Sequence, residues 1–156
     1  MFVKNEVCEG VHRLEYTDSS VVHFEGEGIG EGRIHENKRA WLRREMRGIM
    51  VRTSGEVIAM GLHKFFNLGQ LKENKLKEMA KVGVLEVLEK LDGQMIMGVV
   101  VGDFVEYWSR KGKTPVAVTA TRLVKALPGR HDVLVKFARS QGATVVFEMI
   151  GSQSRI

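Results

Sequence analysis

The chain has 156 residues, of which 44% are hydrophobic, so it is long enough for one domain with a substantial core and too short for two comfortable ones. No run approaches the roughly 18 apolar residues of a membrane span, and charges at Lys4, Glu6 and Glu9 interrupt the apolar core that a signal peptide needs. The single cysteine, Cys8, excludes an intrachain disulfide, and the net charge of +5 suits a polyanionic partner without identifying one, so we expect a cytoplasmic protein with no membrane association.

Residues 1–34 give the weakest secondary-structure signal. Residues 21–24 resemble a strand, and the glycines of the run 26–32 recur at every second position. That spacing is not the fingerprint of a dinucleotide-binding turn, because the third glycine is missing at the required offset and no helix clearly begins there. The run predicts a flexible loop.

The next part of the chain predicts two helices separated by strands. Residues 35–46 have helical composition, and the runs 48–52 and 56–60 predict strands joined by a turn at Ser54 and Gly55. Residues 70–82 follow an amphipathic helical pattern. Its expected inward face consists of Leu71, Leu76, Met79 and Ala80.

The second half of the chain predicts mainly strands. Residues 84–89 form one expected strand, and 94–101 with 104–108 form a hairpin through a Gly-Asp turn. A helix is expected over 132–141 and a final strand over 143–150. The expected core side of that helix consists of Val133, Leu134, Phe137 and Ala138. Short turns between strands and few helices predict an α+β fold with antiparallel sheets.

Lys90-Leu91-Asp92-Gly93 is the motif that indicates chemistry. A lysine amine is nucleophilic only when neutral, and its solution pKa of about 10.4 leaves almost none neutral at pH 7. Neighbouring cations and partial burial lower a lysine pKa, so we expect this segment at the mouth of a sheet, near other cations. Gly93 is expected to make a tight turn with positive φ and to let a ligand approach the backbone. Such a site would form a covalent lysine adduct.

The surroundings of this motif resemble the adenylyltransferase domain of the phage-type RNA ligase 1 family. Five segments match in the family's order over about residues 43–156, and five ordered matches are far more specific than one. They are Arg47-Gly48-Ile49-Met50, Lys64-Phe65-Phe66-Asn67, Lys90-Leu91-Asp92-Gly93, the looser Ser109-Arg110-Lys111-Gly112, and Phe147-Glu148 with Arg155-Ile156.

The resemblance implies a role for each of these positions. Lys90 would attack the α-phosphorus of ATP, with Asp92 helping to hold the lysine. Arg47, Lys64 and Gly93 would belong to the nucleotide pocket. The alternatives are structural: a solvated lysine, a strand-end arginine in an ion pair, and a strand terminus.

Two further positions are implied to bind nucleotide. Lys111, and less surely Arg110, would neutralise phosphate charge in the transition state. Glu148 lies in an apolar run and would need a partner or a ligand if it faced inward, and the family uses this glutamate at the ribose. Phe147 is expected in the core rather than on the adenine. The five histidines show no metal-ligand spacing, so the sequence leaves any metal ligands open.

The chain departs from the family in two ways. The motif lacks the arginine that DNA ligases and capping enzymes carry two residues after the glycine, which favours an RNA ligase. The family also has a motif IV, with a Glu-Gly pair, and a motif V, with paired lysines that bind the ATP phosphates, and we do not find either after Glu148 within these 156 residues. We expect residues 1–156 to be the N-terminal portion of one adenylyltransferase domain, with a second chain as a possible source of the other motifs.

The resemblance therefore implies an ATP-dependent RNA ligase that uses Mg²⁺ and joins an RNA 5′-phosphate to a 3′-hydroxyl through a lysyl-AMP intermediate. One alternative is a catalytically incomplete remnant that binds nucleotide or RNA without turnover. Another is a DNA ligase or capping-type nucleotidyltransferase.

Overall fold

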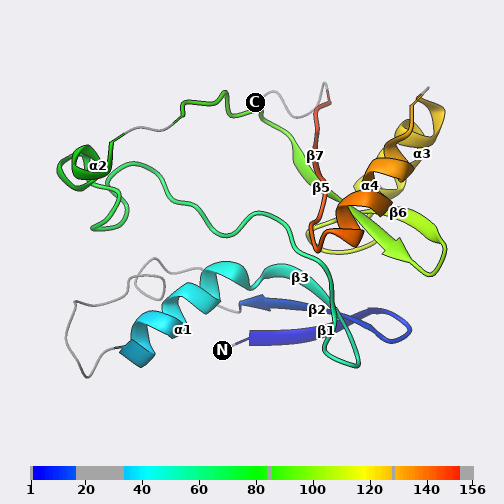
Figure 1. Cartoon of the computed structure of the whole chain (residues 1–156), viewed down its shortest axis with the longest axis horizontal. Helices are drawn as coiled ribbons and strands as arrows, with labels where there is room; N and C mark the ends of the chain where they lie inside the picture. The colour runs from blue at the N-terminus through cyan, green and yellow to red at the C-terminus, as the bar shows by residue number, and fades with distance from the viewer. Residues whose placement is uncertain (1, 17–33, 84–85, 128, 152–156) are drawn as a thin grey trace.

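Two antiparallel sheets form the centre of the structure (Figure 1). The computed structural model describes residues 2–16, 34–83, 86–127 and 129–151. The first sheet has the order β1-β2-β3-β4, formed by β1 (Phe2–Cys8), β2 (Val11–Tyr16), β3 (Arg47–Arg52) and β4 (Val57–Ala59). The second has the order β6-β5-β7, formed by β5 (Gln94–Val101), β6 (Phe104–Ser109) and β7 (Val146–Met149).

The described residues include four helices. They are α1 (Ile34–Glu45), α2 (Leu76–Val82), α3 (Pro115–Ala126) and α4 (His131–Ser140). Of these, α1, α3 and α4 lie against the sheets and α2 lies away from them (Figure 1). Helices α3 and α4 cover one face of the second sheet, and α1 lies beside β3 (Figure 1). The α+β fold with antiparallel sheets predicted from the sequence is confirmed.

Strand β5 contributes side chains to two hydrophobic cores, because successive side chains of a strand point to opposite faces of the sheet. Met97 and Val99 face the first sheet and share a core with Met50 and Ala59 of that sheet and with Trp108 of β6. Met50 and Met97 are both 0% exposed. Unbranched methionine side chains fill irregular gaps, which suits the space between two sheets.

The other face of β5 packs on the helices. Ile96 joins Tyr107 of β6 and Val135 of α4 in a second core, with Phe147 of β7 packed against it. The Tyr107 hydroxyl donates a hydrogen bond of 2.7 Å to the Asp132 carboxylate. Burial and that carboxylate raise the pKa of Tyr107, so the phenol stays neutral.

Gly98 sets the distance between α4 and the second sheet. A Cβ at this position would lie 2.5 Å from a methyl carbon of Val135. Only glycine leaves room for the valine to seat on the strand, and Val135 is consequently the buried residue of α4.

Most elements predicted from the sequence are present. The predicted helices over 35–46 and 132–141 and the predicted hairpin over 94–108 are confirmed to within a few residues. The two strands near 48–60 are confirmed as β3 and β4, and the last strand is the shorter β7. The predicted strand over 21–24 and loop over 26–32 lie outside the described residues.

The predicted helix over 70–82 is wrong in its first half. Helix α2 begins only at Leu76, and residues 67–75 form turns. The amide side chain of Asn74 donates to the Phe66 carbonyl at 3.2 Å, and that of Gln70 accepts from the Asn67 amide at 2.7 Å. These side chains compete with helical backbone bonds. The predicted inward face of this helix is correct at Leu71, which is buried, and wrong at Leu76, Met79 and Ala80, which are exposed.

Two other expectations are corrected. Within the expected strand 84–89, the described residues 86–89 have no regular secondary structure, are exposed and pair with no strand of either sheet. The expected core side of α4 was wrong at Val133, Leu134 and Phe137, which are exposed. The helix turns Val135 inward instead, toward Gly98.

The sequence analysis missed two features. Residues 2–16 form the hairpin of β1 and β2 although this region gave little signal. Helix α3 was also missed, although Thr114 and Pro115 carry a start signal: the Thr114 hydroxyl accepts from the Ala117 amide, and proline stands at the first helical position. Among the described residues, no helix is long and apolar enough to cross a membrane.

We predict that Gly98→Ala lowers the free energy of unfolding by about 1–3 kcal/mol, because the added methyl group overpacks the contact with Val135. Urea unfolding measures this change. Val135→Ala in the Gly98→Ala background removes the clash, so the double variant should lose less stability than the sum of the single variants. Strict additivity would show that this contact does not set the helix position.

Candidate nucleotide and phosphate site

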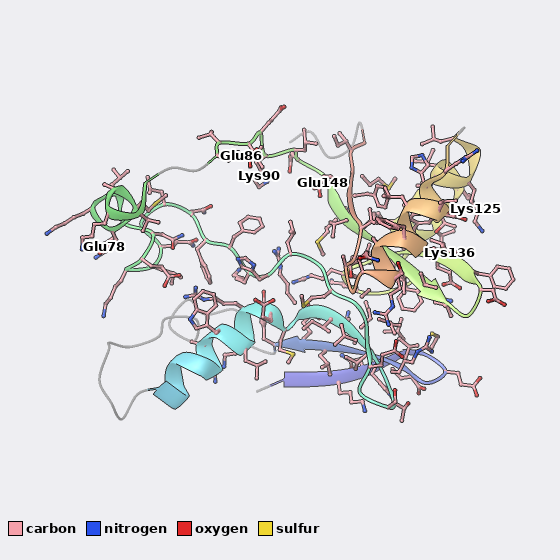
Figure 2. All side chains as sticks on the ribbon, viewed as in Figure 1. Glu78, Glu86, Lys90, Lys125, Lys136 and Glu148 are labelled. Atoms are coloured by element: carbon pink, nitrogen blue, oxygen red, sulfur yellow. The ribbon has the colours of Figure 1, made fainter. Side chains whose placement is uncertain are left out.

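Five of the seven predicted site residues line one cavity of about 650 Å³. They are Arg47, Lys64, Lys90, Gly93 and Glu148. The remaining wall is formed by Leu62, Phe65, Asn67, Gln70, Glu89, Leu91 and Met95. These residues come from β3, the segment 62–70, the segment 89–93 and the paired strands β5 and β7, so segments distant in sequence meet here. Figure 2 shows Lys90 and Glu148 in the upper middle of the view, Lys90 on the segment between α2 and the second sheet and Glu148 on β7.

A second cavity of about 450 Å³ adjoins the first. Arg47, Lys64 and Met95 line both cavities. The second cavity is completed by Tyr16, Gln94, Ser109, Arg110, Lys111, Thr114 and Val116. Four of its lining side chains are basic and none is acidic, so its chemistry suits an anion even though Arg110 also pairs with Glu15 at 3.3 Å.

Lys90 lies on an exposed segment rather than partly buried at the end of a strand. The expectation of partial burial is therefore corrected. Residues 86–92 have no regular secondary structure, and the apolar side chains Val87 and Leu88 are exposed, so packing does not draw this segment into the core.

Gly93 begins the return of this segment to the sheet. Its φ is not positive, so the expected left-handed turn is wrong. A Cβ on Gly93 would instead collide with the carbonyl oxygen of Met149 on β7. The glycine is needed because the neighbouring strand approaches the backbone closely, which brings β7 and its Glu148 to the cavity.

Arg47 lies at the boundary of the two cavities. Its Nε is buried and has no hydrogen-bond partner, and its guanidinium lies 5.4 Å from the centre of the Phe65 ring. A buried donor without a partner is costly, and an anion in the adjoining cavity would satisfy it. The next residue, Gly48, has φ of +82°, and a Cβ there would collide with the backbone of Arg110. This close approach brings the basic turn of Arg110 and Lys111 to Arg47.

The Lys64 segment is held in place by Arg44 at the end of α1. The Lys64 amide donates to the Arg44 carbonyl at 2.8 Å. The Arg44 side chain is 7% exposed, forms a 2.5 Å ion pair with Glu73, and stacks near Trp41 and Phe66. One arginine therefore joins α1, the segment carrying Lys64 and the turns that precede α2.

The turn that presents Lys111 is rigidified by Ser109. The Ser109 hydroxyl is buried, donates to the Gly112 carbonyl at 3.1 Å and accepts from the Lys111 amide at 3.1 Å. The Thr114 hydroxyl, which caps α3, donates to the Ser109 hydroxyl oxygen at 3.0 Å. The basic side chain of Lys111 thus stands on a fixed backbone at the second cavity.

Phe147 and Glu148 point to opposite faces of β7. Phe147 packs edge-on against Tyr107, with ring centres 5.7 Å apart, so its expected place in the core is confirmed. Glu148 is exposed and lines the larger cavity, where Glu89 also lies. The apolar residues around Glu148 in the sequence therefore do not surround it in the fold.

The structure separates the remaining predicted residues. Lys111 lines the second cavity and not the first, and Asp92 is exposed and lines neither. The sequence analysis missed Asn67, Gln70, Glu89 and Tyr16. Asn67 belongs to the matched segment and could have been included, whereas Tyr16 carried no signal because it comes from the unexpected hairpin.

Within the described residues, no group of three or more His, Cys, Asp or Glu side chains could enclose a metal ion. Glu89 and Glu148 are the two carboxylates of the larger cavity. Mg²⁺ needs no enclosing set of protein ligands, because it commonly binds one or two carboxylates together with substrate phosphates and water. The two carboxylates fit this manner of binding.

Comparison with known proteins identifies the family. A family model described as RNA ligase matches residues 45–156. A protein of Thermovibrio ammonificans (strain DSM 15698 / JCM 12110 / HB-1) named "Putative RNA ligase" is 34% identical over 120 residues, which cover 74% of this chain. Both matches place the chain among the ligases. The chain belongs to the RNA ligase family, which confirms the resemblance seen in the motifs. It spans 30% of the length of this relative.

We predict that Arg44→Lys lowers the free energy of unfolding by about 1–2 kcal/mol, because lysine lacks the planar group that both pairs with Glu73 and stacks on two rings. Chemical denaturation measures this loss. Arg52→Lys is the matched control, since Arg52 forms an exposed pair with Glu56 that should contribute little. Equal losses in the two variants would contradict a special role for Arg44.

Proposed function

We propose that this chain carries the adenylate-forming part of an ATP-dependent RNA ligase, with Lys90 as the nucleophile. The observation that supports this proposal best is the meeting of Lys90, Arg47, Lys64 and Glu148 around one cavity, beside a second cavity lined by basic side chains. Membership of the RNA ligase family supports it independently.

The proposed reaction has three steps. The neutral amine of Lys90 attacks the α-phosphorus of ATP, the bond to the β-phosphate oxygen breaks, pyrophosphate leaves and the amine proton passes to water. An oxygen of the RNA 5′-phosphate then attacks the adenylate phosphorus and releases the lysine. Finally, an RNA 3′-hydroxyl attacks the 5′-phosphate and displaces AMP.

The two cavities would hold different parts of the ATP molecule. The adenosine and α-phosphate would occupy the larger cavity, with Glu148 close enough to serve the ribose hydroxyls as an acceptor. The outer phosphates would extend past Arg47 and Lys64 to Lys111, where cations stabilise the charge of the leaving group. Asp92 lines neither cavity, so we assign it no direct contact with the nucleotide.

Mg²⁺, held through Glu89 or Glu148 and the phosphates, would neutralise phosphate charge when bound. The residues of the chain do the remaining work of binding and orientation. Arg47 fixes the phosphates with a guanidinium whose position is set by Phe65. The segment carrying Lys64 is positioned through Arg44.

A second candidate function is nucleotide or RNA binding without turnover. The exposure of Lys90 on a segment without regular structure favours it, because an exposed amine gains little activation from burial. The two candidates differ in covalent chemistry and agree on binding, so labelling and binding must be measured separately.

We predict that α-labelled ATP and Mg²⁺ yield a denaturation-resistant AMP adduct that peptide mapping assigns to Lys90. Lys90→Arg should abolish the adduct while keeping the charge, because a guanidinium is a poor nucleophile. Lys77→Ala is the control, since Lys77 is exposed on α2 and lines neither cavity. An adduct that survives Lys90→Arg, or no adduct from the folded wild type, would contradict this role of Lys90.

We also predict that inorganic pyrophosphate binds the second cavity and that Arg47→Met weakens this binding about tenfold or more, the equivalent of one lost charge-assisted hydrogen bond. Calorimetric titration measures the affinity. Arg52→Met is the control for a general loss of positive charge, because Arg52 lies outside both cavities. If pyrophosphate binds the wild-type protein but labelled ATP forms no adduct on Lys90, the result supports the alternative of binding without turnover.

A further inference from the structure

A third concave surface, the α3 groove, lies away from the proposed nucleotide site. It has a volume of about 280 Å³ and lies between β6, an edge strand, and the helix α3. Its basic side chains are Lys113, Arg122 and Lys125, and the remaining lining is Glu106, Tyr107, Trp108, Ala117, Val118 and Thr121. Figure 2 shows Lys125 at the end of the molecule far from Lys90.

The carboxylate in the groove neutralises only part of this charge. Glu106 accepts hydrogen bonds from Lys113 at 2.7 Å and from the Trp108 indole at 2.6 Å. Burial alone would raise the pKa of Glu106, but these two donors and the charges of Lys113 and Lys125 lower it, so the carboxylate stays ionised. With three cations against one carboxylate, the groove is an anion-attracting surface.

Arg122 and Lys125 have no ion-pair partner among the residues that the structure describes. They are three positions apart on one helix, so their side chains lie on the same face, about 5–6 Å apart at Cβ. Both are exposed, whereas the floor below them includes the buried Ala117 and Trp108. Two cations without an ion-pair partner, above an apolar floor, are well placed to contact successive phosphates of one strand.

The groove lies on the other side of the basic turn from the second cavity. The basic turn and the first turn of α3 separate the two: Lys111, Thr114 and Val116 line the second cavity, whereas Lys113, Ala117 and Val118 line the groove. A polyanion that leaves the second cavity over this turn would meet Lys113 first and then Arg122 and Lys125.

We propose that the α3 groove binds the phosphodiester backbone of single-stranded RNA whose 5′-phosphate end lies at the Lys90 site. This inference rests on the proposed function for the identity of the polyanion. Phosphate contacts of this kind are independent of base sequence and position the strand.

The test measures binding of a fluorescent 5′-phosphorylated oligouridylate by anisotropy over a series of salt concentrations. Arg122→Gln combined with Lys125→Gln removes two phosphate contacts, which should weaken binding and reduce the slope of log affinity against log salt by about 1.4, or about 0.7 per contact. The matched control is Lys77→Gln combined with Lys136→Gln, which removes the same charge from exposed positions outside the groove. The control should keep the wild-type slope.

A substitution that is expected to strengthen RNA binding gives a second test. Glu106→Gln removes the carboxylate that holds Lys113 while an amide oxygen can still accept from Trp108. Lys113 then becomes free for a phosphate, so binding should tighten at low salt and the slope should steepen by about 0.7. Circular dichroism checks that each variant is folded.

The outcomes separate this inference from the proposed function. Equal slopes for the groove and control variants, or salt-independent binding by the wild type, would overturn the groove proposal even if Lys90 is labelled by ATP. Groove-dependent binding without labelling of Lys90 would uphold the groove and overturn the catalytic role.

Discussion

The hydrophobic core shared by the two sheets, which includes Met50 and Met97, is the packing on which the rest of the structure depends. Both side chains are fully buried, and with Trp108 and Ala59 they hold the sheets face to face. No predicted site residue belongs to this core. The site residues instead extend from strand ends and connecting segments that the two sheets bring together, so the cavities exist only because the sheets are packed. Damage to this core would remove the site without touching any residue in it.

Close backbone approaches then set the details of the site. Gly48 lets the basic turn of Arg110 reach β3, Gly93 lets the Lys90 segment pass beside β7, and Gly98 lets α4 seat on β5. In each case a Cβ would collide with a neighbouring segment, and two of the three neighbours carry side chains of the cavities. Arg44 performs the same task with a side chain, since it joins α1 to the Lys64 segment. The segments around the cavities are thus positioned by glycines that permit close backbone contacts and by Arg44, which contacts several segments at once.

Charge distribution follows from the same arrangement. Arg47, Lys64 and the adjacent pair Arg110 and Lys111 come from three segments, and the fold places them around one cavity whose lining contains no Asp or Glu; Glu15, outside the lining, pairs with Arg110. The basic turn continues to Lys113, whose pairing with Glu106 leaves Arg122 and Lys125 as the uncompensated charges of the α3 groove. A single turn, fixed by the Ser109 hydroxyl, therefore connects two anion-attracting surfaces.

The sequence by itself determined the family, the α+β class and the hairpin of β5 and β6, and its motifs predicted five of the residues that line the larger cavity. Motifs and local periodicity are properties of neighbouring residues, so they can be recognised without the fold. Only the tertiary structure decided which face of α4 is buried, that residues 67–75 form turns, that Lys90 is exposed, and that Asp92 lies outside both cavities. Those outcomes depend on partners distant in the chain: Val135 of α4, for example, is buried because Gly98 of β5 leaves space for it.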